Sequence, residues 1–168
     1  MAINYELVTI LPERPDSADA IKLIDELEAV LNPLYPSESR HGFSVEKLVI
    51  EKVAFFVLRY DGVAAGCGGV KLFGREYGEL KRIFVRSRYR GMGFSKFIME
   101  HLANYARVRG ICVLRLETGI YQPEAIGLYE RLGYQRIGPF GEYKEDPLSI
   151  YFEKKIDLRS EDQIGNKK

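Results

Sequence analysis

The sequence contains few of the residues that build disulfides or metal centres, with two cysteines and two histidines among 168 residues. Cys67 and Cys112 each lie within an apolar run, so we expect both to be reduced core residues rather than a bridge or a metal pair. His41 and His101 are the only histidines, and these counts argue against a structural zinc site. We therefore predict a protein without a metal.

The sequence also lacks a strong net charge and a long hydrophobic run. Its formal charge is +1 at neutral pH, so no broad field draws it to nucleic acid or to a membrane surface. No apolar stretch approaches the roughly 20 residues that span a bilayer. The N-terminus has no charged segment followed by a long apolar one, as a signal peptide would have. We expect a cytoplasmic protein with neither a nucleic-acid nor a membrane partner, in which any anion recognition is local.

What is present is the ordinary balance of a globular domain, with 46% hydrophobic and 29% charged residues. A chain of this length suggests one domain. We predict a single domain over residues 1–156, followed by a polar tail, 157–168, that is disordered.

Apolar spacing and turn residues predict the order strand, two helices, three antiparallel strands, helix, strand, helix and two strands. The expected strands cover residues 3–10, 53–60, 63–73, 79–85, 111–117, 134–137 and 148–155. The expected helices follow a cap at Asp16 or Ser17, cover 45–49, begin at Phe94 and begin at Pro123, with Leu128 and Leu132 turned inward in the last. The strand–helix–strand unit at 79–117 needs a crossover, which makes its strands parallel. The sequence therefore predicts an α/β fold in which a mostly antiparallel mixed sheet has helices on both faces.

Residues 90–96 form a glycine-rich turn between a strand and a helix. The first turn of a helix has unpaired N–H groups and a favourable dipole for anions. Gly91 and Gly93 carry no side chains, so the backbone can approach an oxygen-rich ligand closely. Arg88, Arg90 and Lys96 add positive charge. The pattern indicates a phosphate site.

Three interpretations of this turn compete. The first is a bend of glycines with solvated arginines and no ligand. The second is a dinucleotide site, in which Glu117 at the end of the next strand would bind a ribose, although Lys96 replaces the third glycine of that fingerprint. The third is a site for the pyrophosphate of coenzyme A.

Two segments resemble the GNAT acetyltransferase superfamily. Residues 79–85 (Glu-Leu-Lys-Arg-Ile-Phe-Val) and 89–95 (Tyr-Arg-Gly-Met-Gly-Phe-Ser) are similar to its cofactor motif, which reads Arg or Gln, any two, Gly, any, Gly or Ala. Ser95 departs from the last position but remains small. A register that starts at Arg88 also fits the letters, and we prefer the one at Arg90 because it places the apolar stripe of the helix correctly.

The second family signature resembles residues 122–134, with Gln122 where members commonly carry Asn. The resemblance runs from about Tyr5 to Ile156, and the two motifs are specific at their mutual spacing. It implies the GNAT acyl-CoA N-acyltransferase fold, with one splayed parallel pair of strands and about four helices. It also implies acetyl-CoA as the acetyl donor, with cofactor-binding residues Ile83, Phe84, Val85, Arg90, Gly91, Met92, Gly93, Phe94, Ser95, Lys96 and Gln122.

The resemblance implies two catalytic residues. Tyr129 matches the usual general acid of the family, since a phenol can protonate the leaving thiolate; the alternative is a core tyrosine on an amphipathic helix. Glu79 is the candidate base, and the alternative is an ion pair with Lys81 or Arg82. A strand amide near Val85 would stabilise the oxyanion.

The acceptor pocket of the family lies where this sequence has the loop 35–43. We expect Tyr35, Ser37, His41 and Glu117 to bind substrate, with Arg40 beside them and Tyr121, Phe140 and Tyr143 on the opposite wall. The leading function is transfer of acetyl to the primary amine of a small, amino-acid-like or other polar molecule, by direct attack in a ternary complex. The alternatives are a protein lysine or N-terminal acetyltransferase and a non-catalytic acetyl-CoA sensor. Exposed sheet edges and the habit of the family favour a homodimer.

Overall fold

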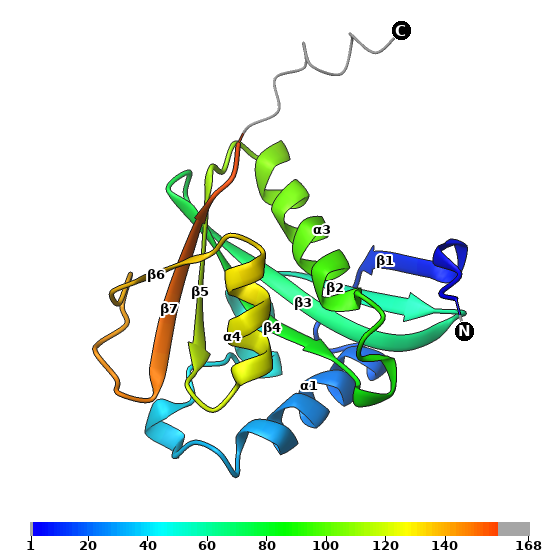
Figure 1. Ribbon diagram of the computed structural model, residues 1–168, viewed down its shortest axis with the longest axis horizontal. Coiled ribbons are helices and arrows are strands. Elements are labelled where there is room, and N and C mark those ends of the chain that lie inside the picture. The colour runs from blue at the N-terminus through cyan, green and yellow to red at the C-terminus, as the bar shows by residue number, and fades with distance from the viewer. Residues whose placement is uncertain (1, 158–168) are drawn as a thin grey trace, which may run out of the picture.

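The computed structural model describes residues 2–157, which form seven strands and four α-helices (Figure 1). The strands are β1 (Val8–Pro12), β2 (Ala54–Tyr60), β3 (Val63–Phe73), β4 (Tyr77–Val85), β5 (Val113–Gly119), β6 (Gln135–Ile137) and β7 (Ser149–Lys155). The helices are α1 (Ala18–Leu31), α2 (Val45–Ile50), α3 (Phe94–Val108) and α4 (Pro123–Arg131). The predicted tail lies outside the described residues except for Asp157.

All seven strands join one sheet in the order β1-β2-β3-β4-β5-β7-β6. Every neighbouring pair is antiparallel except β4 and β5, which are parallel as the crossover through α3 requires. The predicted fold class is therefore confirmed.

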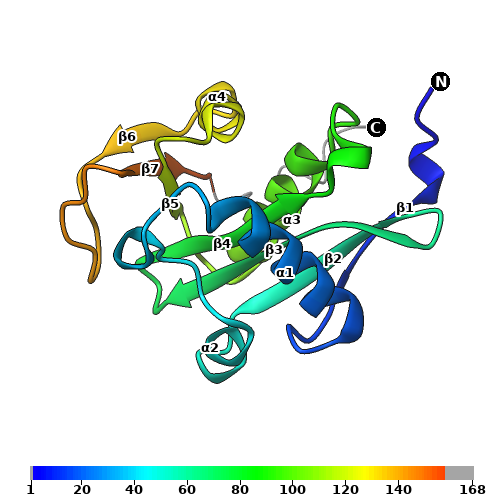
Figure 2. The same ribbon diagram turned by 90° about the horizontal axis from the view of Figure 1, so that it is seen from below.

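Helices cover both faces of the sheet because the side chains of each strand alternate between faces (Figure 2). Phe55 and Val57 of β2 pack with buried residues of α1 and α2, such as Leu23 and Leu48. Their neighbours in β2 belong to the larger core on the other face, with α3 and with Tyr129 of α4. The sheet is thus the middle layer of three.

Two local features open the centre of the sheet. β4 and β5 pair only at Gly78–Leu114 and Glu79–Arg115, and the strands separate beyond that point. On the other side of β4, Arg82 and Ile83 stand opposite the single residue Gly68 of β3. This β-bulge holds Arg82 at a φ of 57°, a conformation that non-glycine residues rarely adopt. The sheet therefore opens between β4 and β5, beside residues 80–85 of β4.

Three sequence predictions need correction. The first strand begins at Val8 rather than at residue 3, because Asn4 caps a 3-10 turn over Tyr5–Leu7. Cys67 is buried, but Cys112 is exposed before the start of β5 and is not a core residue. In α4 the buried residue is Tyr129, while Leu128 and Leu132 are only partly buried.

Candidate active site

The glycine turn leads directly into α3, as the spacing predicts. Gly91 and Gly93 have φ values of 78° and 79°, which only glycine adopts without strain. Gly93 is the N-cap of α3, and no side chain caps the helix there. The first-turn amides therefore lack both intrahelical acceptors and a cap. A Cβ added at either glycine would meet nothing within 4 Å and would project into open space.

That open space is part of a cleft of about 560 Å³ between β4, the start of α3 and the start of α4. Ten of the eleven residues expected to bind the cofactor line it: Ile83, Phe84, Val85, Arg90, Gly91, Gly93, Phe94, Ser95, Lys96 and Gln122. The exception, Met92, packs against the hydrophobic core instead. Arg90 lies 3.7 Å from Glu124, and this exposed ion pair holds the guanidinium only weakly.

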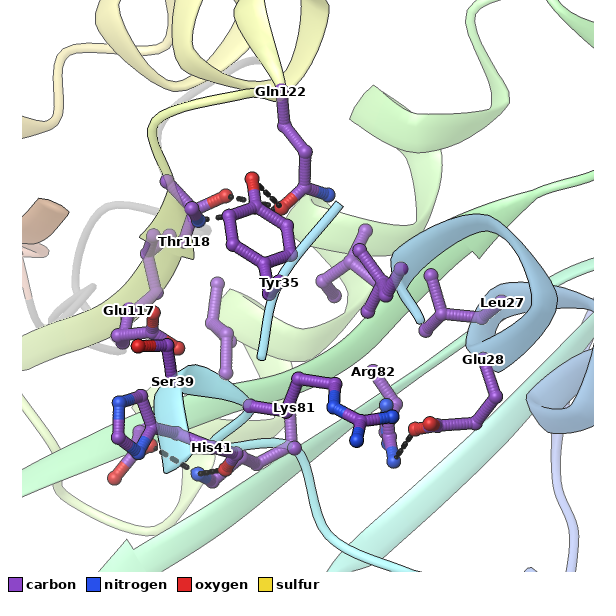
Figure 3. Close-up of a pocket in the computed structure, with 18 of the residues that line it drawn as sticks. Leu27, Glu28, Tyr35, Ser39, His41, Lys81, Arg82, Glu117, Thr118 and Gln122 are labelled. Atoms are coloured by element: carbon purple, nitrogen blue, oxygen red, sulfur yellow. Dashed lines mark hydrogen bonds and ion pairs between the residues drawn. The ribbon is translucent and has the colours of Figure 1, made fainter. Parts of the chain in front are cut away.

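A second, smaller cavity of about 100 Å³ adjoins this cleft (Figure 3). Tyr35 and His41 line it from the loop after α1, Glu79 lines it from β4, and Glu117 lines it from β5. Ser37 lies apart from them on a neighbouring hollow of about 510 Å³ between α1 and α2. The structure thus brings together three of the four predicted substrate residues.

Tyr129 lies at the junction of the two cavities. It lines both of them, as do Leu27, Ile83 and Gln122. Its ring packs against Tyr134 and Phe152, and its side chain is 8% exposed. Burial, and to a lesser extent the charge of Glu117, raise the pKa of the phenol to about 12. The hydroxyl therefore stays protonated at neutral pH.

Glu79 shares its Oε2 atom between two donors. Lys81 Nζ lies 2.6 Å away, and the Tyr143 hydroxyl donates at the same distance. Lys81 also donates to that hydroxyl at 2.8 Å and approaches the His41 carbonyl at 3.4 Å. Burial lowers the pKa of Lys81, and the charge of Glu79 opposes this effect. The ion pair that the sequence left as an alternative for Glu79 is present.

Glu117 has a different environment from Glu79. Among residues 2–157, no cation lies within ion-pairing distance of its carboxylate. Burial raises its pKa, while Ser149, His41 and Lys81 partly oppose that shift. Of the three glutamates that line the cavity, Glu28 and Glu79 are therefore ion-paired, and Glu117 has no cationic partner among residues 2–157.

Two loops from distant parts of the sequence close over the cavity. His41 Nε2 lies 3.3 Å from Asp146 Oδ2, and the His41 ring contacts the edge of Tyr143. Arg82 fixes the first loop, since its Nε donates to the Phe43 carbonyl at 2.8 Å and its guanidinium pairs with Glu28 of α1. Sequence reasoning did not find Asp146, because nothing local marks a residue whose partner lies 105 positions away.

Comparisons with known proteins show the family of this chain. A model described as the acetyltransferase (GNAT) family matches residues 24–134, well over half of the chain. The chain belongs to the GNAT acetyltransferase family.

Close relatives of this GNAT protein carry acetyltransferase names. An "IAA acetyltransferase" of Azospirillum brasilense is 39% identical over 150 residues, which cover 89% of this chain and 98% of that protein. A Klebsiella pneumoniae crystal structure named as an acyl-CoA N-acyltransferase is 35% identical, with a TM-score of 0.77, and covers 90% of this chain and 99% of its own. The protein is therefore an N-acetyltransferase.

A more distant GNAT structure has coenzyme A bound. It is the PaiA N-acetyltransferase of Thermoplasma acidophilum, which is 18% identical, with a TM-score of 0.68, over 88% of this chain and 99% of that one. At this identity the likeness concerns the fold alone.

Gln122 stands where the second family signature commonly has Asn. Its Oε1 atom accepts from the Gly119 amide at 3.2 Å and lies 3.4 Å from the hydroxyls of Thr118 and Tyr35 (Figure 3). Tyr35 in turn accepts from the Tyr121 amide at 2.9 Å. Gln122 thus ties the loop after α1 to the turn between β5 and α4.

Residues 2–157 contain neither a metal-binding cluster nor a membrane-spanning helix. Within them, no group of three or more histidine, cysteine, aspartate or glutamate side chains is arranged to hold a metal ion. In the same part of the chain, every helix is too short or too polar to cross a membrane.

Proposed function

We propose that this N-acetyltransferase transfers acetyl from acetyl-CoA to the primary amine of a small, amino-acid-like molecule. The observation that carries the proposal is the meeting of two cavities at Tyr129, where β4 and β5 separate. A donor held in the larger cleft and an acceptor held in the smaller cavity would meet beside that hydroxyl.

The residues of the larger cleft fit acetyl-CoA. The unpaired amides at the start of α3 suit a diphosphate, and Arg90 and Lys96 add charge at the same place. The backbone of Ile83–Val85 has no partner strand on its β5 side, so it can pair with the amide groups of the pantetheine arm. Acetyl-CoA supplies an activated acetyl group, and the protein aligns it.

The smaller cavity fits a small acceptor with an anionic group. In it, Lys81 is paired with Glu79, and Arg82 with Glu28. Arg40 also lines the cavity, and among the described residues its partner is the amide side chain of Asn32 rather than a carboxylate. A carboxylate on the acceptor would supply Arg40 with a counter-ion, and a volume of about 100 Å³ favours a molecule of few atoms.

Direct attack in a ternary complex suits the same geometry. Neither cysteine lines either cavity, so no thiol stands at the junction to carry the acetyl group. Tyr129 is placed to give its proton to the departing thiolate.

The proposal is tested by measuring acetyl-CoA-dependent release of free CoA thiol with a panel of amines. The panel pairs each aminocarboxylate with its carboxamide and adds diamines and lysine-containing peptides. We expect aminocarboxylates to be acetylated with the highest kcat/KM, with initial rates that intersect as a sequential mechanism requires. Preferential acetylation of the peptides would contradict the small-molecule assignment, and absence of turnover with every amine would contradict the proposal as a whole.

A further inference from the structure

Glu79 and Glu117, the carboxylates that β4 and β5 contribute to the acceptor cavity, have unequal environments. Glu79 Oε2 receives both the Lys81 ammonium and the Tyr143 hydroxyl at 2.6 Å, and its side chain is 4% exposed. Two donors therefore compete with an approaching amine for this oxygen of Glu79.

Glu117 meets the opposite conditions. It lies on β5, lines the cavity, and is close enough to Tyr129 for its charge to raise the pKa of that phenol. No lysine, arginine or histidine of residues 2–157 lies within ion-pairing distance of it. A carboxylate in this situation favours its neutral form, so it gains by accepting a proton.

The titratable and charged groups around the cavity come from every element packed against it. They are Glu28 of α1, Glu79, Lys81 and Arg82 of β4, Tyr35, Arg40 and His41 of the loop after α1, Tyr129 of α4, Tyr143 and Asp146 of the loop before β7, and Tyr151 of β7, with the Ser149 hydroxyl beside them. Lys81 and His41 are the cations among them whose charge acts on Glu117, and each has a carboxylate partner of its own.

We propose that Glu117 is the general base of the acetyl transfer, and that Glu79, Lys81 and Tyr143 are positioning residues that hold the two cavity loops against β4. This inference rests on the proposed function. It reverses the assignment that the family resemblance implies, in which Glu79 is the base. The resemblance marked Glu117 only as a substrate contact.

Two residues handle the protons of this step, one as acceptor and one as donor. The amine nitrogen forms a bond to the acetyl carbon, and the bond from that carbon to sulfur breaks. Glu117 takes the proton that the nitrogen loses, and Tyr129 gives its proton to the thiolate. A proton then returns from Glu117 to Tyr129 through solvent, so the products are the amide and the free thiol.

The test compares two variants of equal shape, Glu117→Gln and Glu79→Gln, with an acceptor that the wild-type protein acetylates. We expect Glu117→Gln to lower kcat/KM for the amine at neutral pH by about a hundredfold, in the range of general-base effects, with an unchanged Kd for acetyl-CoA. The rate of the wild type should rise with pH through the titration of Glu117. In Glu117→Gln that limb should be lost, leaving only the titration of the amine.

Glu79→Gln is the control. We expect this variant to keep the same limb of the pH profile. Its KM for the amine should rise and its thermal stability should fall, because the loops are held less firmly. A Glu117→Gln protein with the wild-type rate and pH profile would overturn the inference and leave the proposed function intact. Failure of the wild type to acetylate any amine would instead overturn the proposed function.

Discussion

Tyr129 lines both the larger cleft and the smaller cavity, so its hydroxyl gives the sharpest test of the proposed function at the residue scale. Within residues 2–157, the pKa of that hydroxyl is shifted by burial and by the charge of Glu117, and not by a hydrogen bond. The packing contacts are made by the ring, against Tyr134 and Phe152. A phenylalanine would keep the packing and remove only the proton.

We predict that Tyr129→Phe lowers kcat by about 10²-fold or more, the usual contribution of a general acid. The Kd for acetyl-CoA and the thermal midpoint should stay close to wild type. Steady-state kinetics and calorimetry check both expectations. A variant with wild-type kcat would make Tyr129 a core residue only.

Glu117 also gives a prediction about stability. Its pKa is raised above the ordinary value of 4.5, so the folded protein binds its proton more tightly than the unfolded chain does. The stability contributed by this group is fully present below about pH 4.5 and is lost as the pH rises through the raised pKa.

Glu117→Gln should therefore be more stable than the wild type at pH 7, and the difference should shrink as the pH falls toward 4. Urea unfolding at several pH values measures it. Glu153→Gln is the control, because Arg115 pairs with that carboxylate at 2.8 Å and its loss should not stabilise the protein. A Glu117→Gln protein less stable than the wild type at pH 7 would contradict the raised pKa of Glu117.

At the scale of elements, the proposed function assigns acetyl-CoA binding to the junction between the glycine turn and α3. Gly93→Val would place a β-branched side chain at a φ of 79° and fill the space beside the first-turn amides. Gly62 offers a matched control, since it has a φ of 77°, similar open space, and a place in the β2–β3 hairpin outside both cavities.

We predict that Gly93→Val loses measurable acetyl-CoA binding while Gly62→Val retains it, with comparable losses of stability in the two variants. Isothermal titration and thermal unfolding separate the effects. Equal acetyl-CoA affinity in both variants would remove the glycine turn from the binding site.

Elements with strong local signals were predictable from the sequence. β3 runs over Val63–Phe73 as expected, because Asp61 and Gly62 set the turn before it. Helix α3 starts at Phe94 because Gly93 caps it. The start of β1 was not predictable from alternation, since the side chain of Asn4 stabilises a competing turn.

Side-chain direction within the motifs was less predictable than their position. Met92 lies between two glycines of the motif, yet it packs into the core because the turn presents its backbone rather than this side chain. Ser37 lies two residues after Tyr35, where it begins a 3-10 turn and lines the neighbouring hollow.

At the scale of the whole molecule, long-range contacts complete the site. Tyr143 reaches Glu79 across 64 positions, and His41 reaches Asp146 across 105. No local pattern encodes these pairings, because they depend on how the loop before β7 packs against the sheet. From the sequence, ten of the residues that line the larger cleft could be grouped together in advance, but the lining of the smaller cavity only in part.

The whole arrangement depends on one claim, that the gap between β4 and β5 joins a diphosphate site to an acceptor cavity at Tyr129. A crystal structure with acetyl-CoA tests it directly. The account predicts the diphosphate on the amides at the start of α3 and the thioester sulfur next to the Tyr129 hydroxyl. A diphosphate bound elsewhere, or a thioester directed away from Tyr129, would contradict it.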